Sequence, residues 1–306
     1  MNLYINSAKE NWVVDRFIKE FKEFDKIRST RLLFNADLIW IIAPWTWRKI
    51  PIKYLKRNKV VCTIHHIDED KFDEIAKKEF LERDSIVNQY HVISESTYKQ
   101  VSNLTIKPIK IIPFWVNQNI WFEIKNRDQI LDKYKLDNKK FYIGSFQRDT
   151  EGSDLISPKL SKGPDRFIEI LRRKKEEHNL CVIITGKRRN YLIKKLNEEK
   201  IEYKYFEMVS FSELNELYNI LDLYIVSSRY EGGPQAILEC AITRTPIIST
   251  DVGIASEILS TSSIYQMNNF HEAKPDIEYA YKNVIKYQIP EGMKHYRKLF
   301  LESYEN

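Results

Sequence analysis

The chain has 306 residues, of which 43% are hydrophobic and 30% are charged, with a formal net charge of +6. These values are typical of globular proteins and exclude a disordered chain, and the length allows one large domain or two of ordinary size. The basic residues are scattered and form no recognised nucleic-acid-binding motif. The mild positive charge therefore indicates an anionic ligand or surface, and we expect no nucleic acid partner.

Three features of the sequence predict a cytoplasmic protein. The cysteines, Cys62, Cys181 and Cys240, are far apart, lack zinc-ligand spacing and lie in apolar segments, as buried free thiols do. The first residues lack the basic and apolar regions of a signal peptide. The longest apolar stretch without a charge, Leu38–Trp47, is too short to cross a bilayer.

Short apolar runs rich in β-branched residues alternate with helical patterns along the chain. The expected strands are 3–6, 38–43, 60–65, 89–93, 110–113, 141–146, 181–186, 203–206, 223–226 and 246–250. The main expected helices are 70–83, 165–177, 191–199, 212–221 and 234–242. This alternation predicts an α/β protein with parallel sheets and helices on both faces, and so many strands fit two doubly wound halves better than one sheet.

The domain boundary is expected in a polar segment that follows the strand at 110–113. We assign residues 1–118 to an N-terminal Rossmann-like domain and residues 119–289 to a C-terminal one. Residues 290–306 begin with Pro-Glu-Gly and continue in an amphipathic pattern. They predict a terminal helix that crosses back to the N-terminal domain.

Two short motifs in the first half bear on partners. Trp45 and Trp47 stand among lysines and arginines, which is typical of peripheral contact with the inner face of a membrane. The same residues also suit a polyanionic or sugar acceptor, or a helix with one solvated basic face. The acidic triplet Asp68–Asp70 precedes an expected helix, where acidic residues favour the helix dipole, so we expect no metal site there.

The glycines locate the ligand site in the second half. The chain has eight, and none lies within the first 143 residues. Glycine permits close approach of the backbone to a ligand, and the later glycines recur at or after the ends of expected strands. Ligands of open α/β sheets bind beyond the carboxyl ends of the strands.

The segment Ser227–Glu239 combines an anion site with carboxylates. Gly232, Gly233 and Pro234 lead into a helix, whose bared amides and dipole attract phosphate. Glu231 and Glu239 flank this site, and carboxylates repel phosphate but accept hydrogen bonds from hydroxyl groups. A nucleoside-diphosphate sugar has phosphates between two polyol ends and fits this pattern. The alternative is a simple turn with solvated glutamates.

Four segments resemble the donor-site signature of the retaining family-4 glycosyltransferases. They are residues 231–234, 238–241, 246–253 and 257–258. The resemblance implies the GT-B fold, with two facing Rossmann-like domains and parallel sheets. It also implies that Glu231 holds hydroxyls of the donor sugar and Glu239 the ribose hydroxyls. The amides of Gly232 and Gly233, just before Pro234, would meet the diphosphate or the sugar.

Three further segments extend the resemblance. Residues 144–148 and 162–165 correspond to the family's phosphate clamps, which implies catalytic roles for Arg148 and Lys162 and a place for Gly144 in the donor site. Residues around Met208 correspond to backbone contacts with the nucleobase. Segment 149–161 is longer than in the family and is a candidate flap.

Two groups of basic or histidine residues leave alternatives open. His66 corresponds to a family histidine that faces the cleft, with His65 as the competing register and a structural histidine as the alternative. Residues 187–189 form a basic cluster that either approaches phosphate or begins a helix in solvent, and we favour the second interpretation. The N-terminal glycine loop of many family members is absent, since residues 6–9 are Asn-Ser-Ala-Lys.

The resemblance implies a retaining glycosyltransferase that needs no metal or other cofactor. It would move a hexose-type sugar from a nucleoside-diphosphate sugar to a glycan, lipid or small-molecule acceptor. The alternatives are a related GT-B enzyme such as a nucleotide-sugar epimerase, or a sugar-nucleotide-binding protein without catalysis.

Overall fold

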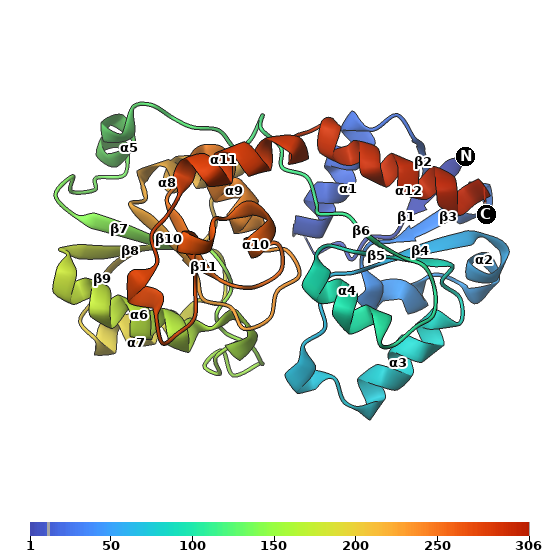
Figure 1. Cartoon of the computed structure of the whole chain (residues 1–306), viewed down its shortest axis with the longest axis horizontal. Helices are drawn as coiled ribbons and strands as arrows, with labels where there is room; N and C mark the ends of the chain where they lie inside the picture. The colour runs from blue at the N-terminus through green and yellow to red at the C-terminus, as the bar shows by residue number, and fades with distance from the viewer. Residues whose placement is uncertain (11–12, 306) are drawn as a thin grey trace. The chain divides into compact units, whose positions relative to one another are not determined.

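The computed structural model of the protein describes residues 1–10 and 13–305. The chain divides into two compact units (Figure 1). Unit 1 contains residues 1–115 and 287–306, and unit 2 contains residues 116–286. Each unit has its own six-stranded sheet, and every pair of neighbouring strands is parallel. The predicted fold class is therefore confirmed.

Unit 1 contains the strand order β2-β1-β3-β4-β5-β6. Its strands are β1 (Asn2–Ile5), β2 (Arg28–Thr30), β3 (Leu38–Ile41), β4 (Lys59–Ile64), β5 (Gln89–Val92) and β6 (Ile109–Ile111). The edge strand β2 was not predicted, because it has three residues and no apolar side chain. The other five lie where apolar runs predicted them.

Helices cover both faces of the unit 1 sheet. They are α1 (Val13–Phe24), α2 (Ile52–Arg57), α3 (Glu74–Asp84), α4 (Glu95–Ser102) and α12 (Lys294–Glu305). On one face, rings of α1 and α12 pack on the central strand, with Phe21 and Phe300 both against Trp40. The last helix of the chain thus packs on the first sheet. On the other face, α2, α3 and α4 bury Leu55, Phe80 and Val101.

Helix α3 begins later than predicted. Residues 69–71 form a separate turn, and the Asp73 side chain accepts a hydrogen bond from the amide of Ala76 at 2.9 Å, which caps the helix at Glu74. Across the described residues, no group of histidine, cysteine and acidic side chains is arranged to hold a metal ion. Among those same residues, no helix combines the length and apolar character needed to cross a bilayer.

Unit 2 contains the strand order β12-β11-β10-β7-β8-β9. Its strands are β7 (Phe141–Ser145), β8 (Leu180–Thr185), β9 (Glu202–Phe206), β10 (Leu223–Val226), β11 (Ile247–Thr250) and β12 (Ile264–Tyr265). The two-residue strand β12 was not predicted. The chain adds strands on one side of β7 and then on the other, so the order reverses between β7 and β10.

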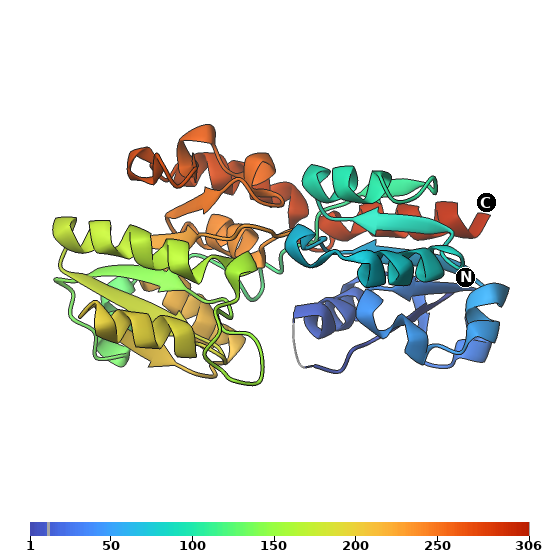
Figure 2. The ribbon, with the colours of Figure 1, turned by 90° about the horizontal axis from the view of Figure 1, so that it is seen from below.

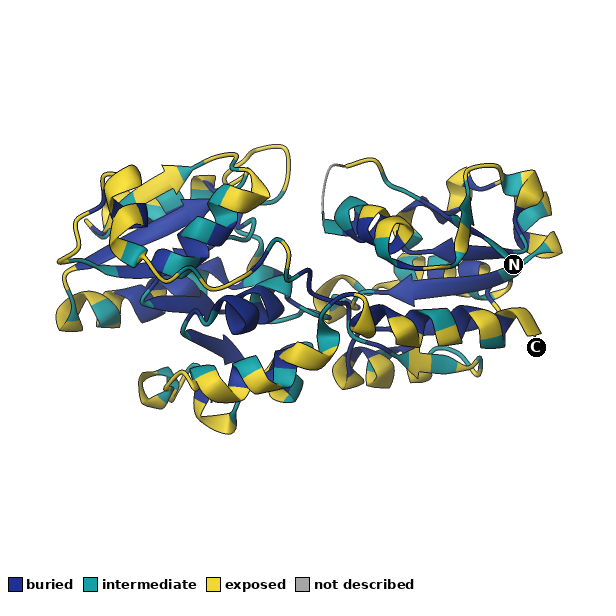
Figure 3. Ribbon diagram, turned by 90° about the horizontal axis from the view of Figure 1, so that it is seen from above, coloured by how far each residue is buried: buried dark blue, intermediate teal, exposed yellow. Residues whose placement is uncertain are grey.

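Helices also enclose the unit 2 sheet on two sides (Figures 1 and 2). They are α5 (Arg127–Lys133), α6 (Pro164–Glu177), α7 (Asn190–Glu198), α8 (Phe211–Ile220), α9 (Gln235–Thr243), α10 (Ala255–Ile258) and α11 (Ile277–Val284). Helices α6 and α7 pack on one face, and α8 and α9 lie on the other. The strands are buried between helices whose outer faces are exposed (Figure 3). All three cysteines are buried and free.

Candidate functional site

The predicted donor residues gather at the carboxyl ends of the unit 2 strands. The loops that follow β7 and β10 leave the sheet side by side, because these two strands are hydrogen-bonded neighbours. The strand order reverses between them, and such a switch point is where open α/β sheets bind ligands. One loop contains Arg148 and Lys162, and the other contains Glu231.

The two loops are fastened to each other by the backbone. Gly163 adopts a φ of +62°, and a Cβ added there would lie 1.9 Å from the Ser227 carbonyl oxygen. The Ser227 hydroxyl donates to the Gly163 carbonyl at 2.8 Å, and the Arg229 amide donates to the Ser161 carbonyl at 2.8 Å. The Arg229 guanidinium also binds both carboxylate oxygens of Asp165, at 2.8 and 2.6 Å. Only glycine at position 163 permits this approach.

The loop after β11 packs against the segment that contains Gly232 and Gly233. Gly253 has a φ of +56°, and a Cβ added there would lie 2.4 Å from the Gly232 carbonyl oxygen. The Thr250 hydroxyl donates to the Ser228 carbonyl at 2.7 Å. Neighbouring loops therefore hold segment 228–232 at two places. Pro234 is the residue immediately before α9, where its missing N–H costs nothing.

Lys162 and Glu231 form an ion pair inside this constellation. The two side chains are only 20% and 9% exposed, and the Ser228 hydroxyl also donates to Glu231 Oε1 at 3.3 Å. The Gln147 amide donates to the Lys162 carbonyl at 3.0 Å, which fixes the turn before α6. The pair brings a predicted phosphate clamp and a predicted hydroxyl acceptor into direct contact, although they are 69 residues apart in sequence.

Arg148 lies at the start of the long segment 149–161. Its Nε donates to the carbonyl oxygen of Thr150 at 2.9 Å. Partial burial lowers the pKa of its guanidinium from the ordinary value, and the positive charge of Arg188 adds to the effect. The group keeps its charge because this pKa starts so far above neutrality. Burial and the neighbouring cation thus outweigh the effect of the Glu151 carboxylate on Arg148.

Glu239 is buried in α9 with 6% of its surface exposed. Its Oε2 accepts a hydrogen bond from the Tyr218 hydroxyl of α8 at 2.9 Å. Burial raises the pKa of Tyr218 well above its ordinary value, and the Glu239 charge adds to this, so the hydroxyl keeps its proton. The interpretation of both glutamates as solvated is wrong, because neither Glu231 nor Glu239 is exposed. Tyr218 was not predicted, and its place in a helical apolar pattern gave no signal.

Two other predicted donor residues have different surroundings. Gly144 lies within β7, where an added Cβ would come within 2.2 Å of Leu221 and 3.1 Å of Tyr224. Packing therefore accounts for this glycine, and its contact with a donor stays a prediction. Met208 lies between β9 and α8 with 70% of its surface exposed.

Arg189, in the basic cluster 187–189, neither approaches the predicted phosphate site nor begins a helix in solvent. This side chain is fully buried and forms an ion pair with Asp149 at 2.5 Å. Its guanidinium also donates to the carbonyl oxygens of Ser145 and Thr185, both at 2.7 Å. Asp149 in turn accepts a hydrogen bond from the amide of Leu192 at 3.2 Å. Arg189 thus fastens the beginning of segment 149–161 to β7, β8 and α7.

Of the three histidines within residues 1–115, one is exposed and two are enclosed. His66 is exposed. His65 binds the Ile42 carbonyl at 2.8 Å, and burial lowers its pKa to about 4. His91 is fully buried, and burial lowers its pKa to about 3. Its ring nitrogens contact the Thr63 hydroxyl at 2.9 Å and the Ile112 carbonyl at 2.7 Å, so it is a structural group of the core.

Only one tryptophan of the basic motif is available for an external contact. Trp45 is 51% exposed, and its indole donates to Glu10 at 3.1 Å. Trp47 is 8% exposed and packs in the core, with the Arg48 guanidinium stacked over its ring. The predicted membrane contact through Trp47 is therefore wrong, because its ring is inside the protein. Arg48 is also paired, with Glu79 and Glu82.

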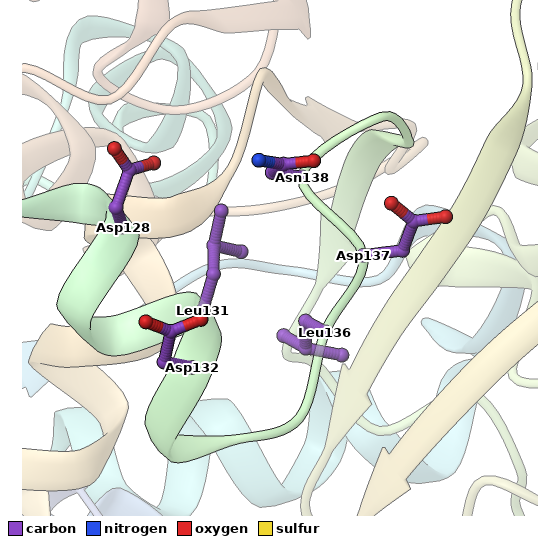
Figure 4. Close-up of a pocket in the computed structure, with 6 residues that line it drawn as sticks. All are labelled: Asp128, Leu131, Asp132, Leu136, Asp137 and Asn138. Atoms are coloured by element: carbon purple, nitrogen blue, oxygen red, sulfur yellow. The ribbon is translucent and has the colours of Figure 1, made fainter.

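A hollow of about 280 Å³ in unit 2 lies away from these residues (Figure 4). Asp128 and Asp132 of α5 and Asp137 of the following loop line it. These residues precede β7, so the hollow is at the amino ends of the strands. A lining of carboxylates would repel phosphate, and this hollow does not suit the predicted donor.

Comparison with known proteins agrees with the arrangement in unit 2. Residues 156–291 match the family model of glycosyl transferases group 1. A probable sucrose-phosphate synthase of Thermosipho melanesiensis is 30% identical over 177 residues, which are 54% of this chain and 37% of that protein. The chain thus covers little more than a third of this curated relative.

Solved structures resemble the chain over almost its whole length. HepE of Anabaena, in complex with UDP and glucose, has a TM-score of 0.74 at 11% identity, over 98% of this chain and 99% of that one. A glycosyltransferase of Rickettsia africae has a TM-score of 0.69 at 15% identity, over 100% and 98%. A sucrose-phosphate synthase of Thermosynechococcus elongatus has a TM-score of 0.70 at 12% identity, over 95% and 77%. These likenesses confirm the GT-B fold.

Proposed function

We propose that the protein is a glycosyltransferase that moves a hexose-type sugar from a nucleoside-diphosphate sugar to an acceptor. The observation that carries the proposal is the Lys162–Glu231 ion pair at the switch point of unit 2, with Arg148 on the same loop. Cations for a diphosphate and a carboxylate for hydroxyls stand together there. The match of residues 156–291 to glycosyl transferases group 1 supports the same reaction class.

Each residue has a distinct role in the proposed reaction. Arg148 and Lys162 offset the negative charge that grows on the leaving diphosphate when the glycosidic bond breaks. Glu231 accepts a hydrogen bond from a sugar hydroxyl, and its contact with Lys162 orients it for this role. Glu239 accepts hydrogen bonds from the ribose, with Tyr218 holding its other oxygen. A uridine nucleotide is the first donor to test, since HepE was solved with UDP-glucose.

We further propose family-4 chemistry, in which the sugar keeps its anomeric configuration and no metal takes part. The acceptor hydroxyl would attack on the face from which the diphosphate leaves, and two fixed cations would take the place of a metal ion at the phosphates. The acceptor is a glycan, a lipid or a small molecule. Trp45, with nearby lysines, is the candidate contact to a membrane surface if the acceptor is a lipid.

The test combines binding and turnover. Calorimetric titration with UDP, GDP, ADP and their glucose conjugates in the presence of EDTA should give one nucleotide with a Kd of about 10 μM, or some −7 kcal/mol. Arg148→Ala should weaken that binding at least ~10-fold. Release of free diphosphate only when an acceptor is added indicates a transferase, whereas release without an acceptor indicates an epimerase-like reaction.

Two results would contradict the proposal. Absence of binding across the whole nucleotide panel would remove the donor site. Binding with no turnover against glycan, lipid and small-molecule acceptors would favour a sugar-nucleotide-binding protein, an alternative that the glycine-free first 143 residues support. An inverted product in the nuclear magnetic resonance spectrum would refute the retaining mechanism alone.

A further inference from the structure

Lys159 is a third cation close to Arg148 and Lys162. Burial, together with the positive charges of Lys162 and Arg148, lowers its pKa to about 8, and the carboxylates of Glu231 and Glu151 only partly oppose this shift. Within residues 1–10 and 13–305, the Lys159 ammonium forms neither an ion pair nor a hydrogen bond. A half-buried lysine among cations is unfavourable unless an anion completes its surroundings.

The backbone of Lys159 is held in place, so its position is not that of a loose surface chain. Its amide donates to the Asp149 carbonyl at 2.7 Å, and its own carbonyl accepts from the amide of Lys162 at 2.9 Å. Thr150 and Pro158 pair as an antiparallel bridge, which closes segment 150–158 into a hairpin (yellow-green in Figure 2). The buried Asp149–Arg189 pair fastens the base of this hairpin to the sheet.

We propose that Lys159 is a third cationic ligand of the donor diphosphate, beside Arg148 and Lys162. This inference rests on the proposed function and adds a residue that the sequence did not single out. Glu231 already offsets the charge of Lys162, so two cations alone leave a diphosphate undercompensated. Lys159 supplies the missing positive charge, and the bound diphosphate supplies the anion that the lysine lacks.

The proposal also assigns a role to the long segment 149–161, which positions Lys159. The hairpin returns the chain to the β7 loop and sets Lys159 one turn before Lys162. A shorter loop would connect Arg148 to Lys162 without presenting a side chain at this point. The hairpin is therefore a platform for a phosphate ligand.

The experiment compares the tightest-binding diphosphate among UDP, GDP and ADP with its monophosphate, by calorimetry at pH 7.5. Lys159→Ala should weaken diphosphate binding ~10-fold or more, as expected for loss of a charge-assisted contact, and monophosphate binding less than about 3-fold. Lys159→Arg should restore diphosphate binding to within about 3-fold. Lys194→Ala is the matched control, because it removes one exposed lysine of α7, and it should bind as the unmodified protein does.

The pH profile supplies a readout that a structural role would not change. The protonated ammonium binds phosphate, so diphosphate affinity of the unmodified protein should fall as the pH rises from 7.5 to 9 through the pKa of about 8. Lys159→Arg should lose most of this fall, since an arginine stays charged. Lys162, Arg148, Glu231 and Glu151, which face Lys159, are the same in both proteins and cancel in the comparison.

Each contrary result has a separate meaning. If Lys159→Ala binds the diphosphate normally while Arg148→Ala does not, the inference is refuted and the donor site stands. If Lys159→Ala loses monophosphate and diphosphate equally, or Lys159→Arg fails to rescue, Lys159 only supports the hairpin and the inference is again refuted. If the unmodified protein binds no nucleotide, the inference and the proposed function are both refuted.

Discussion

Replacing Arg189 by methionine should destabilise the protein and also disturb the donor site. The guanidinium has no exposed surface, and its partner Asp149 is 4% exposed, so solvent screens the pair very little. Loss of the arginine leaves the Asp149 carboxylate buried, although Leu192 and Thr150 still donate to it. Breaking a buried pair by removing one partner typically costs about 3–5 kcal/mol.

The carbonyl oxygens of Ser145 and Thr185 also lose their donor in this variant. Each was bound at 2.7 Å, and an unsatisfied buried acceptor costs about 1–3 kcal/mol unless water reaches it. We therefore expect Arg189→Met to lower the free energy of unfolding by about 4 kcal/mol. Urea denaturation followed by fluorescence measures this, with Arg188→Met, an exposed neighbour, as the matched control.

A double-mutant cycle decides whether the pair is the cause. Combining Arg189→Met with Asp149→Leu removes both charges, and such replacements recover much of the loss. A loss below about 1 kcal/mol in Arg189→Met, or no recovery in the double variant, would refute the reasoning. Because Asp149 begins the segment that contains Lys159, nucleotide affinity should fall in Arg189→Met, even under conditions where the protein is folded.

Three further predictions concern other contacts. Gly163→Ala should destabilise unit 2 by about 2 kcal/mol or more in urea denaturation, because the residue has a positive φ and its Cβ would meet the Ser227 carbonyl. Gly186→Ala is the control, because Gly186 also has a positive φ but has open space around it, and equal losses in the two variants would contradict a steric clash at Gly163. Tyr218→Phe removes only the hydroxyl that holds Glu239 and should weaken nucleotide binding about 5-fold in calorimetry. Tyr205→Phe is the control, because the Tyr205 hydroxyl bonds the Gly186 carbonyl and does not contact Glu239. Unchanged affinity in Tyr218→Phe would show that Tyr218 has no role in the donor site. His91 is neutral in the core with a pKa of about 3, so its contribution to stability is complete above the ordinary value near 6.5 and is lost as the pH falls toward 3. The stability lost between pH 6.5 and pH 5 should be about 2 kcal/mol. His91→Asn should flatten the pH dependence of the free energy of unfolding, measured by urea denaturation between pH 7 and 5.

The strands could be predicted because burial on both faces requires continuous apolar runs. Leu180–Thr185 and Leu223–Val226 are such runs, and both are wholly buried strands. Arg28–Thr30 could not be predicted, because an edge strand of three polar residues is held by its hydrogen bonds to β1 and has no periodicity of its own. The start of α3 was missed for a related reason, since Asp73 caps the helix after a run of acidic residues that all suit a helix start.

The donor site was predictable as far as its residues belong to one local motif. Glu231, Gly232 and Gly233 stand together in the sequence, and the strand before them and the helix after them follow from apolar patterns. Their partners could not be found in that way. Arg189 reads as one of three consecutive basic residues, and only the folded chain shows that its neighbours Lys187 and Arg188 are exposed while it is buried.

The Lys162–Glu231 pair explains why cations and carboxylates occur together at a phosphate site. Without a ligand, a cluster of Arg148, Lys159 and Lys162 would repel itself, and Glu231 reduces this repulsion by pairing with one member. A bound diphosphate would supply negative charge for the other two, and the carboxylate would keep an oxygen available for a sugar hydroxyl. Glu231→Gln should therefore have two separable effects: tighter binding of the free diphosphate, because a repelling charge is removed, and weaker discrimination between the sugar nucleotide and the diphosphate. Calorimetry with both ligands measures the ratio, and a parallel loss of both affinities would show that Glu231 acts only by holding Lys162 in place.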